Sequence, residues 1–192
     1  MSLPTDLPPR YTKPAIVLHW LIAGMMLAAV GLGWLANFLP DAAVRPTIDA
    51  HKSVGLLVFG LAVCRLLWRL GHEPPPLPAR YPAPEVRAAH GAHWVLYGLM
   101  LLLPVTGYLH DSAFKFAAQH PLRIFWLIPF PRLGVIAHMA PGPKQVFHDR
   151  LFALHVWLGY ALYAVFALHV AGALKHQWID REPELQRMGL GR

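Results

Sequence analysis

Four long apolar segments dominate this sequence and limit the folds that it can adopt. In the first, residues 15–39, the only strongly polar side chains are His19 and Asn37. About 20 helical residues are enough to cross the roughly 30 Å hydrocarbon core of a bilayer. Three similar segments follow, at about 51–70, 89–110 and 151–174. The sequence therefore predicts an all-α integral membrane protein, a four-helix bundle with up-down-up-down topology.

The composition supports the same class of protein. Hydrophobic residues make up 56% of the 192 residues and charged residues only 14%, too few to cover a soluble domain of this size. The single cysteine, Cys64, excludes an internal disulfide and is expected to be a small core residue. A cleaved signal peptide is the alternative for the first segment, which is longer than a typical signal core and lacks a convincing cleavage site. We expect one transmembrane domain over residues 1–192, with membrane lipid around it and no nucleic-acid partner.

The distribution of basic residues predicts the orientation. An even number of spans places both termini on one side, and ten of the 17 Lys and Arg residues fall on that side. The positive-inside rule then predicts that both termini are cytoplasmic. A Pro-rich linker at 73–84 lies inside, and a long loop at 111–149 lies outside. The aromatic residues of that loop suggest that part of it lies at the membrane interface, with a poorly ordered loop as the alternative.

Four of the twelve histidines lie at a depth that requires an explanation, because an ionisable group inside a membrane needs a partner or a function. His19 is about one turn into the first span on the inner side, and His51 begins the second span on the outer side. His155 and His169 lie at opposite ends of the fourth span. They are fourteen residues apart, about 21 Å along a helix, and project from nearly the same face.

Antiparallel spans bring these histidines together in pairs. His19 and His169 share the inner level, and His51 and His155 share the outer level. A haem iron takes two axial nitrogens from opposite faces of the porphyrin, so the pattern predicts two bis-histidine haem sites. Small residues suit a haem-lined interior; those expected there are Gly55, Gly159, Ala161 and Ala171. A His-lined path for metal transport fits less well, because no Asp or Glu accompanies the histidines in the membrane.

The other histidines have simpler expected roles. His90 and His93 begin the third span at the inner level, and either is an alternative to His19 or His169, or a contact for a haem propionate or a quinone. For the rest we expect hydrogen-bonded positions at helix ends: His72, His110, His120, His138 and His176. A haem-free scaffold or transporter is a further alternative, and it predicts a colourless protein.

Several motifs together resemble the bacterial cytochrome b561 family of four-helix, di-haem membrane cytochromes. They cover most of the chain: YTKPAIVLHW at 11–20, HKSVG at 51–55, RLLWR at 65–69, AHGAH at 89–93, LPVTG at 103–107, LHVAGALKH at 168–176 and LQRM at 185–188. The resemblance implies an integral b-type cytochrome of the bacterial inner membrane with two haem b groups. It also implies the axial ligands, which fall on His19, His51, His155 and His169.

The best-defined activity that the resemblance implies is superoxide oxidation coupled to ubiquinone reduction. Basic residues are expected to surround the outer haem and attract a small anion: Arg45, Lys52, Lys144, His148 and Arg150. Attraction to anionic lipid headgroups is the simpler interpretation of these basic residues. The alternative function is an electron-carrying cytochrome b subunit that links a partner dehydrogenase or a periplasmic redox protein to quinone. The candidates for the quinone site are Arg65, Arg69, His90 and His93, or the outer loop.

Overall fold

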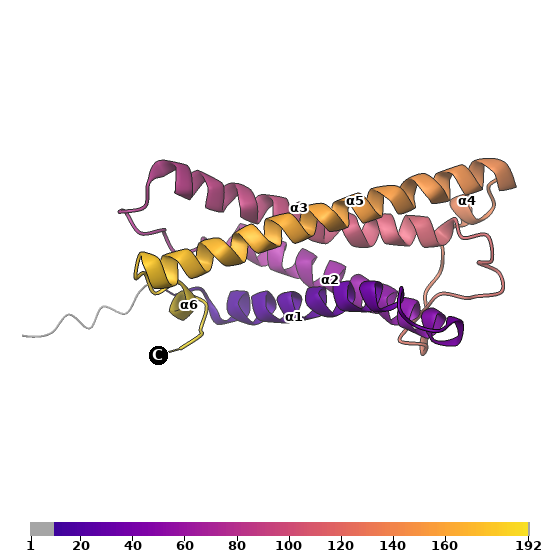
Figure 1. Cartoon of the computed structure of the whole chain (residues 1–192), viewed down its shortest axis with the longest axis horizontal. Coiled ribbons are helices and arrows are strands. Elements are labelled where there is room, and N and C mark those ends of the chain that lie inside the picture. The colour runs from indigo at the N-terminus through magenta and orange to yellow at the C-terminus, as the bar shows by residue number, and fades with distance from the viewer. Residues whose placement is uncertain (1–9, 192) are drawn as a thin grey trace, which may run out of the picture.

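The computed structural model describes residues 10–191. It consists mainly of four long helices (Figure 1). They are α1 (Lys13–Leu35), α2 (Asp41–Gly71), α3 (Ala83–Ser112) and α5 (Pro141–Leu174), which continues as the π-helix η1 (Lys175–Ile179). The short elements are β1 (Arg123–Ile124), β2 (Ile128–Pro129), α4 (Gly134–Ala137) and α6 (Glu184–Arg187). All four long helices have the length and apolar composition needed to cross a membrane. The predicted four-helix membrane bundle is confirmed.

The helices extend beyond the apolar segments from which they were predicted. α2 begins at Asp41 instead of 51, and α5 begins at Pro141 instead of 151. α3 also begins earlier, at Ala83 instead of 89, whereas α1 ends at Leu35 instead of 39. The added turns contain charged residues, so hydropathy does not reveal them, but their backbones continue the helix beyond the apolar segment. The long loop therefore shortens to residues 113–140.

Proline marks the beginning of every long helix. Proline has no N–H to donate, and the first turn of a helix needs none, so its fixed φ angle favours this position. The residues at or beside the helix starts are Pro14, Pro40, Pro84 and Pro141.

Packing in the bundle is uneven. α1 packs mainly against α2, α3 packs against α5, and α2 joins the two pairs through α3. α5 makes few close backbone contacts with α1 or α2, so the space between them is left to side chains. Near the middle of the bundle, Met26, Leu99 and Leu162 form a buried apolar layer.

The outer surface of the bundle is apolar, as lipid contact requires. Leu168 and Trp157 are each 70% exposed on α5. Cys64 is also exposed, so the prediction that it is a core residue was wrong: it lies on the outward face of α2. Ala161 and Ala171 likewise face outward and do not line the interior.

Both ends of the described chain lie at the same end of the bundle, here called the terminal end, and residues 113–140 lie at the opposite loop end (Figure 1). Hydrogen bonds hold the C-terminal segment against the terminal end of the bundle. Trp20 Nε1 donates to the carbonyl of Met188 at 2.8 Å, and Tyr11 N donates to the carbonyl of Arg187 at 3.2 Å. The Arg187 side chain donates to the carbonyls of Pro75 and Pro76 in the Pro-rich linker.

The loop-end connection is folded, in contrast to the alternative of a poorly ordered loop. β1 and β2 form a short antiparallel hairpin. Arg132 ties the connection to α3: its Nε donates to Asp111 Oδ2 at 2.8 Å, and its Nη1 donates to the carbonyls of Ala117 and His120. Ser53 on α2 accepts a hydrogen bond from the backbone N–H of Phe125 at 2.9 Å. These contacts hold the hairpin against α2 and α3.

Candidate functional site

Two histidine pairs lie at two levels inside the bundle. At the loop end, the ring centroids of His51 on α2 and His155 on α5 are 6.1 Å apart, and their planes are inclined by 81°. At the terminal end, the rings of His19 on α1 and His169 on α5 are 6.2 Å apart and inclined by 60°. The structure therefore brings together the pairs that the sequence placed at matching depths. Each pair thus lies between α5 and a helix with which α5 makes few close backbone contacts: α2 at the loop end and α1 at the terminal end.

Hydrogen bonds fix the loop-end histidines. His51 Nδ1 lies 2.7 Å from the carbonyl oxygen of Ala29, and His155 Nδ1 lies 3.0 Å from that of Leu103. A carbonyl oxygen can only accept, so each Nδ1 carries the proton and each Nε2 keeps its lone pair. Thr106 Oγ1, which itself donates to a backbone carbonyl, lies 3.1 Å from His155 Nδ1 and is a second acceptor for that N–H.

Two glycines make room for these rings. A β-carbon at position 33 would lie 3.3 Å from His51 Nδ1, and one at position 107 would lie 3.3 Å from His155 Cε1. Neither Gly33 nor Gly107 could have been assigned this role from the sequence, because the role depends on how the helices cross.

A cavity of about 810 Å³ surrounds the loop-end pair. Its wall is largely apolar and includes Met26, Val30, Val58, Leu103 and Leu162. Gly55 and Gly159 line it, as predicted for these two small residues. One part of the wall carries charge, from Lys52 and Asp111. This combination suits a large, flat, apolar ligand with an ionised edge.

The terminal-end pair has a third histidine beside it. His93 on α3 lies 5.2 Å from His169, centroid to centroid. A smaller cavity of about 380 Å³ adjoins it, lined by His90, His93, Arg69 and Tyr11 together with the Pro-rich linker. His90 and His93 are thus near this site, as the sequence predicted, but His90 forms no ring contact with the pair among residues 10–191.

Arg65 points into the bundle. A basic side chain in the last turns of a span can extend toward the headgroups, but Arg65 Nε donates to Tyr97 Oη at 3.1 Å and Nη1 donates to the carbonyl of Ala15 at 3.0 Å. Ala15 lies one turn before His19, so this guanidinium is close to the terminal-end pair. Arg69, the next basic residue on α2, lies over the rings of Trp94 and Tyr97.

Several of the charges at the loop end are paired. Lys52 Nζ lies 2.8 Å from Asp111 Oδ1 and 3.2 Å from Asp49 Oδ1, and Arg45 Nε lies 3.4 Å from Asp49 Oδ2. The predicted positive mouth is therefore partly neutralised by two carboxylates that the sequence did not place there. Of the expected basic residues, Arg150 is exposed and forms no ion pair among residues 10–191.

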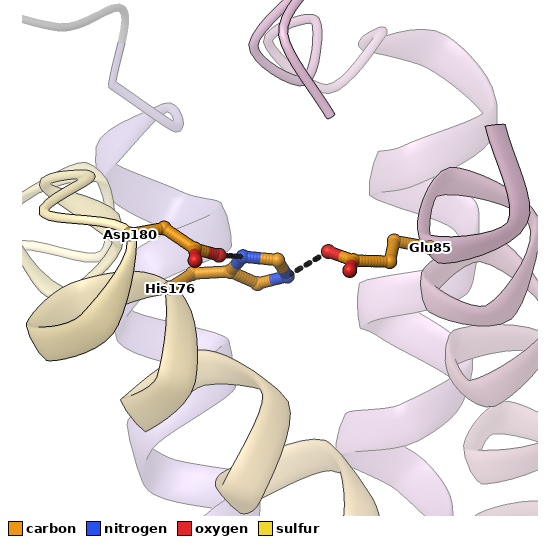
Figure 2. Close-up of side chains that lie close together, drawn as sticks. All are labelled: Glu85, His176 and Asp180. Atoms are coloured by element: carbon orange, nitrogen blue, oxygen red, sulfur yellow. Dashed lines mark hydrogen bonds and ion pairs between the residues drawn. The ribbon is translucent and has the colours of Figure 1, made fainter. Parts of the chain in front are cut away.

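Outside the two pairs, Glu85, His176 and Asp180 converge at the terminal end (Figure 2). Their potential metal ligands lie within 4.8 Å of one another, but Lys175 Nζ lies 2.9 Å from both Glu85 Oε2 and Asp180 Oδ2. The ammonium group thus supplies the positive charge that a cation would bring. Hydrogen bonds from Lys175 and His176 hold the pKa of Asp180 below its ordinary value of 3.8. This cluster ties the start of α3 to the end of α5.

Several remaining histidines have the helix-end roles expected of them. His72 and His138 bond through Nδ1 to the carbonyls of Trp68 and Gly134, and His176 bonds to Asp180 at 2.7 Å. His110 instead packs against His148, with ring centroids 4.0 Å apart.

Comparison with known proteins agrees with this architecture. A family model described as prokaryotic cytochrome b561 matches residues 10–191. Cytochrome b561 homolog 2 of Escherichia coli K12 is 32% identical over 187 residues, which cover 96% of this chain and 93% of the relative. Probable superoxide oxidase CybB of Yersinia pestis is 27% identical over 183 residues, covering 93% and 95%. Cytochrome b562 of Cereibacter sphaeroides is 28% identical over 189 residues, covering 94% and 95%.

The family match spans nearly all of the chain and includes all four long helices and both histidine pairs. Four apolar helices with paired histidines between them are what a membrane protein needs to hold b-type haem and transfer electrons. The chain belongs to the prokaryotic cytochrome b561 family of membrane electron-transfer proteins.

Proposed function

We propose that the chain is a di-haem cytochrome b, in which His51 and His155 would hold a loop-end haem and His19 and His169 would hold a terminal-end haem. The observation that carries this proposal is the equal spacing of the two pairs, 6.1 and 6.2 Å between ring centroids. Two metal–nitrogen bonds of about 2.0 Å, plus about 1.1 Å from each nitrogen to its ring centre, give roughly 6 Å. The 5.2 Å between His93 and His169 is too short for that arrangement.

The surroundings of the loop-end pair also fit a haem. A neutral imidazole binds iron through a nitrogen lone pair, and a bond from its other N–H to a carbonyl fixes the ring and makes it more basic. His51 and His155 both have such a bond. The apolar cavity wall suits the macrocycle, and Lys52 is placed to pair with a propionate. Bound haem supplies one-electron redox chemistry at each level.

The function that this arrangement supports best is superoxide:ubiquinone oxidoreductase of the bacterial inner membrane, with both termini cytoplasmic. Two superoxide anions would each lose one electron at the loop end and leave as oxygen. A ubiquinone would take up the two electrons with two protons and leave as ubiquinol. A relative named as a probable superoxide oxidase supports this choice of substrate.

The chain's own residues have separate parts in this reaction. Arg150, exposed at the loop end, would attract the anion. The terminal-end cavity offers polar groups from Arg69, His90 and His93 beside the second histidine pair, and these suit the carbonyl oxygens of a quinone headgroup. Between the two levels, the layer of Met26, Leu99 and Leu162 keeps the bundle dry.

The test is ubiquinol formation by the purified full chain supplied with superoxide. We expect ubiquinol to form, and added superoxide dismutase to abolish it. His51→Ala should lose the activity while the protein keeps its terminal-end haem. A haem-loaded protein that forms no ubiquinol from superoxide would contradict the enzyme assignment.

A second candidate function, a cytochrome subunit that accepts electrons from a redox-protein partner, has one observation in its favour. The hairpin at the loop end exposes Leu127 by 79%, Ile128 by 61% and Trp126 by 52%. Phe125 and Trp126 both have positive φ angles, a conformation that costs energy for aromatic residues. The exposed apolar side chains of this hairpin suit contact with an apolar surface of a partner protein or with the lipid interface.

A further inference from the structure

The two loop-end histidines are held by the same local arrangement on two different helices. On α1, the carbonyl of Ala29 accepts the Nδ1–H of His51, and the glycine at position 33 follows four residues later. On α3, the carbonyl of Leu103 accepts the Nδ1–H of His155, and a glycine at position 107 again follows four residues later.

The four-residue spacing has a physical reason. In an α-helix the carbonyl of residue i points toward the N–H of residue i+4, and the side chain at i+4 leans back over that carbonyl. A glycine at i+4 leaves the carbonyl open to a second donor from a neighbouring helix. A β-carbon would lie 3.3 Å from Nδ1 and 3.4 Å from Cε1 of His51 at position 33, and 3.3 Å from Cε1 and 3.5 Å from Nδ1 of His155 at position 107.

The other glycines of these two helices differ. A β-carbon at Gly24, Gly31, Gly91 or Gly98 would have no neighbouring atom within 4 Å. Gly33 and Gly107 are therefore the glycines of α1 and α3 at which a β-carbon would crowd a neighbouring side chain, and in both cases that side chain is a ring of the loop-end pair.

We propose that Gly33 and Gly107 are positioning residues for the loop-end haem, each keeping open the backbone carbonyl that orients one ligand imidazole. This proposal rests on the proposed di-haem function. The bond to a carbonyl increases the electron donation of the imidazole, which favours the oxidised iron and lowers the reduction potential.

The two levels differ in this respect. Among residues 10–191, no hydrogen bond to a ring nitrogen of His19 or His169 is found, whereas both loop-end rings have one. Arg65 is also close to the terminal-end pair, and a positive charge there favours the reduced iron. The loop-end haem is therefore the one of lower potential, and an electron received there moves to the terminal end energetically downhill.

The experiment is a redox titration combined with electron paramagnetic resonance of single variants of the haem-loaded protein. Gly33→Ala and Gly107→Ala place a methyl group against the ligand rings, and Gly31→Ala and Gly98→Ala place the same group on the same helices in open space. His51→Ala identifies which signals come from the loop-end haem. Alanine favours helix more than glycine does, so the variants are expected to fold.

We expect Gly33→Ala and Gly107→Ala to raise the potential of the loop-end haem and to shift its low-spin g-values, which report the orientation of the two imidazole planes. The terminal-end haem should keep its own potential and g-values, and the two control variants should match the unmodified protein. Thr106→Val removes an acceptor for His155 without adding bulk, so it should produce a smaller rise.

The proposal is overturned if both test variants leave the loop-end signals unchanged, or if the controls shift them equally. It is also overturned if the loop-end haem has the higher potential. A protein that binds no haem in any form would contradict the proposed function itself, so the two failures are distinguishable.

Discussion

At the scale of single residues, the first question is which imidazoles bind iron. Each loop-end ring has its Nδ1–H committed to a carbonyl, which leaves Nε2 as the metal-binding atom. We predict that His51→Ala or His155→Ala lowers the haem content from two per chain to one and removes the lower-potential haem. His19→Ala or His169→Ala should remove the other one. Haem quantification with a redox titration measures both, and loss of the same haem from all four variants would refute the pairing.

His93 is the residue that tests the choice of ligands at the terminal end. Its ring is closer to His169 than is that of His19, but 5.2 Å leaves too little space for an iron between them. His93→Ala should therefore keep both haems with low-spin spectra, whereas His19→Ala should lose one. A low-spin terminal-end haem that survives His19→Ala and disappears in His93→Ala would show that His93 is the ligand.

Residue roles differ in how far the sequence could predict them. His19, His51, His155 and His169 could be paired because depth in a span follows directly from position along it. The carbonyls that hold His51 and His155 could not be found, because every residue has a carbonyl and only helix crossing selects one. The inward direction of the Arg65 side chain could not be predicted for the same reason, because a position near the end of a span does not say which way the side chain turns.

At the scale of helices, the apolar segments predicted the number and order of the spans but not where each helix ends. Turns that carry charged residues, such as 41–50, lie outside the apolar segment, and hydropathy does not distinguish them from a loop. The face that each helix turns inward was also hard to predict, because lipid-facing side chains are as apolar as buried ones. Cys64, Ala161 and Ala171 were placed inside for that reason and lie outside.

The contact between α3 and α5 at the terminal end predicts a pH dependence. Asp180 accepts hydrogen bonds from Lys175 and His176, which lower its pKa below the ordinary 3.8. The unfolded chain takes up this proton at a higher pH than the folded protein does. The contribution to stability is therefore complete above the ordinary pKa and is lost as the pH falls through the lowered one.

Thermal unfolding in detergent measures this effect. Between about pH 5 and about pH 3, the midpoint of the unmodified protein should fall by more than that of Asp180→Asn, which has no proton to gain. Glu73→Gln, at an exposed carboxylate with no ion pair among residues 10–191, should fall in parallel with the unmodified protein. Equal slopes for Asp180→Asn and the unmodified protein would show that the cluster does not contribute.

The loop-end connection predicts a second effect on stability. Arg132 is largely buried, with its side chain 9% exposed, and it holds Asp111 and two backbone carbonyls of the connection. Arg132→Ala should destabilise the protein by about 2 kcal/mol, the usual loss for hydrogen bonds to a charged group, and should make residues 113–140 easier to cleave by proteases. The exposed Arg123 provides the control, since Arg123→Ala should change neither midpoint nor cleavage rate. Equal cleavage of the two variants would contradict the role given to Arg132.

At the scale of the whole molecule, the net charge of +7 has two parts. The Lys and Arg residues near the terminal end predict orientation, and several at the loop end are already paired with Asp49 and Asp111. What is left to attract an anion comes from unpaired residues such as Arg150. Arg150→Gln should slow ubiquinol formation from superoxide by roughly twofold or more at low ionic strength and flatten its salt dependence.

Arg87→Gln makes the same change in net charge at the exposed terminal end and should leave the rate and its salt dependence unchanged. Stopped-flow measurement at several ionic strengths compares the two variants. If they behave alike, the rate depends only on total charge, and local attraction at the loop end is not part of the mechanism.

In the proposed architecture, one chain holds two haems at two levels of a four-helix bundle, each between two histidine rings whose centroids are about 6 Å apart. Haem quantification of the purified full chain, together with a reduced-minus-oxidised absorption spectrum, tests this architecture. We expect b-type bands and two haems per chain. A colourless protein, or a fully loaded one with a single haem per chain, would contradict it.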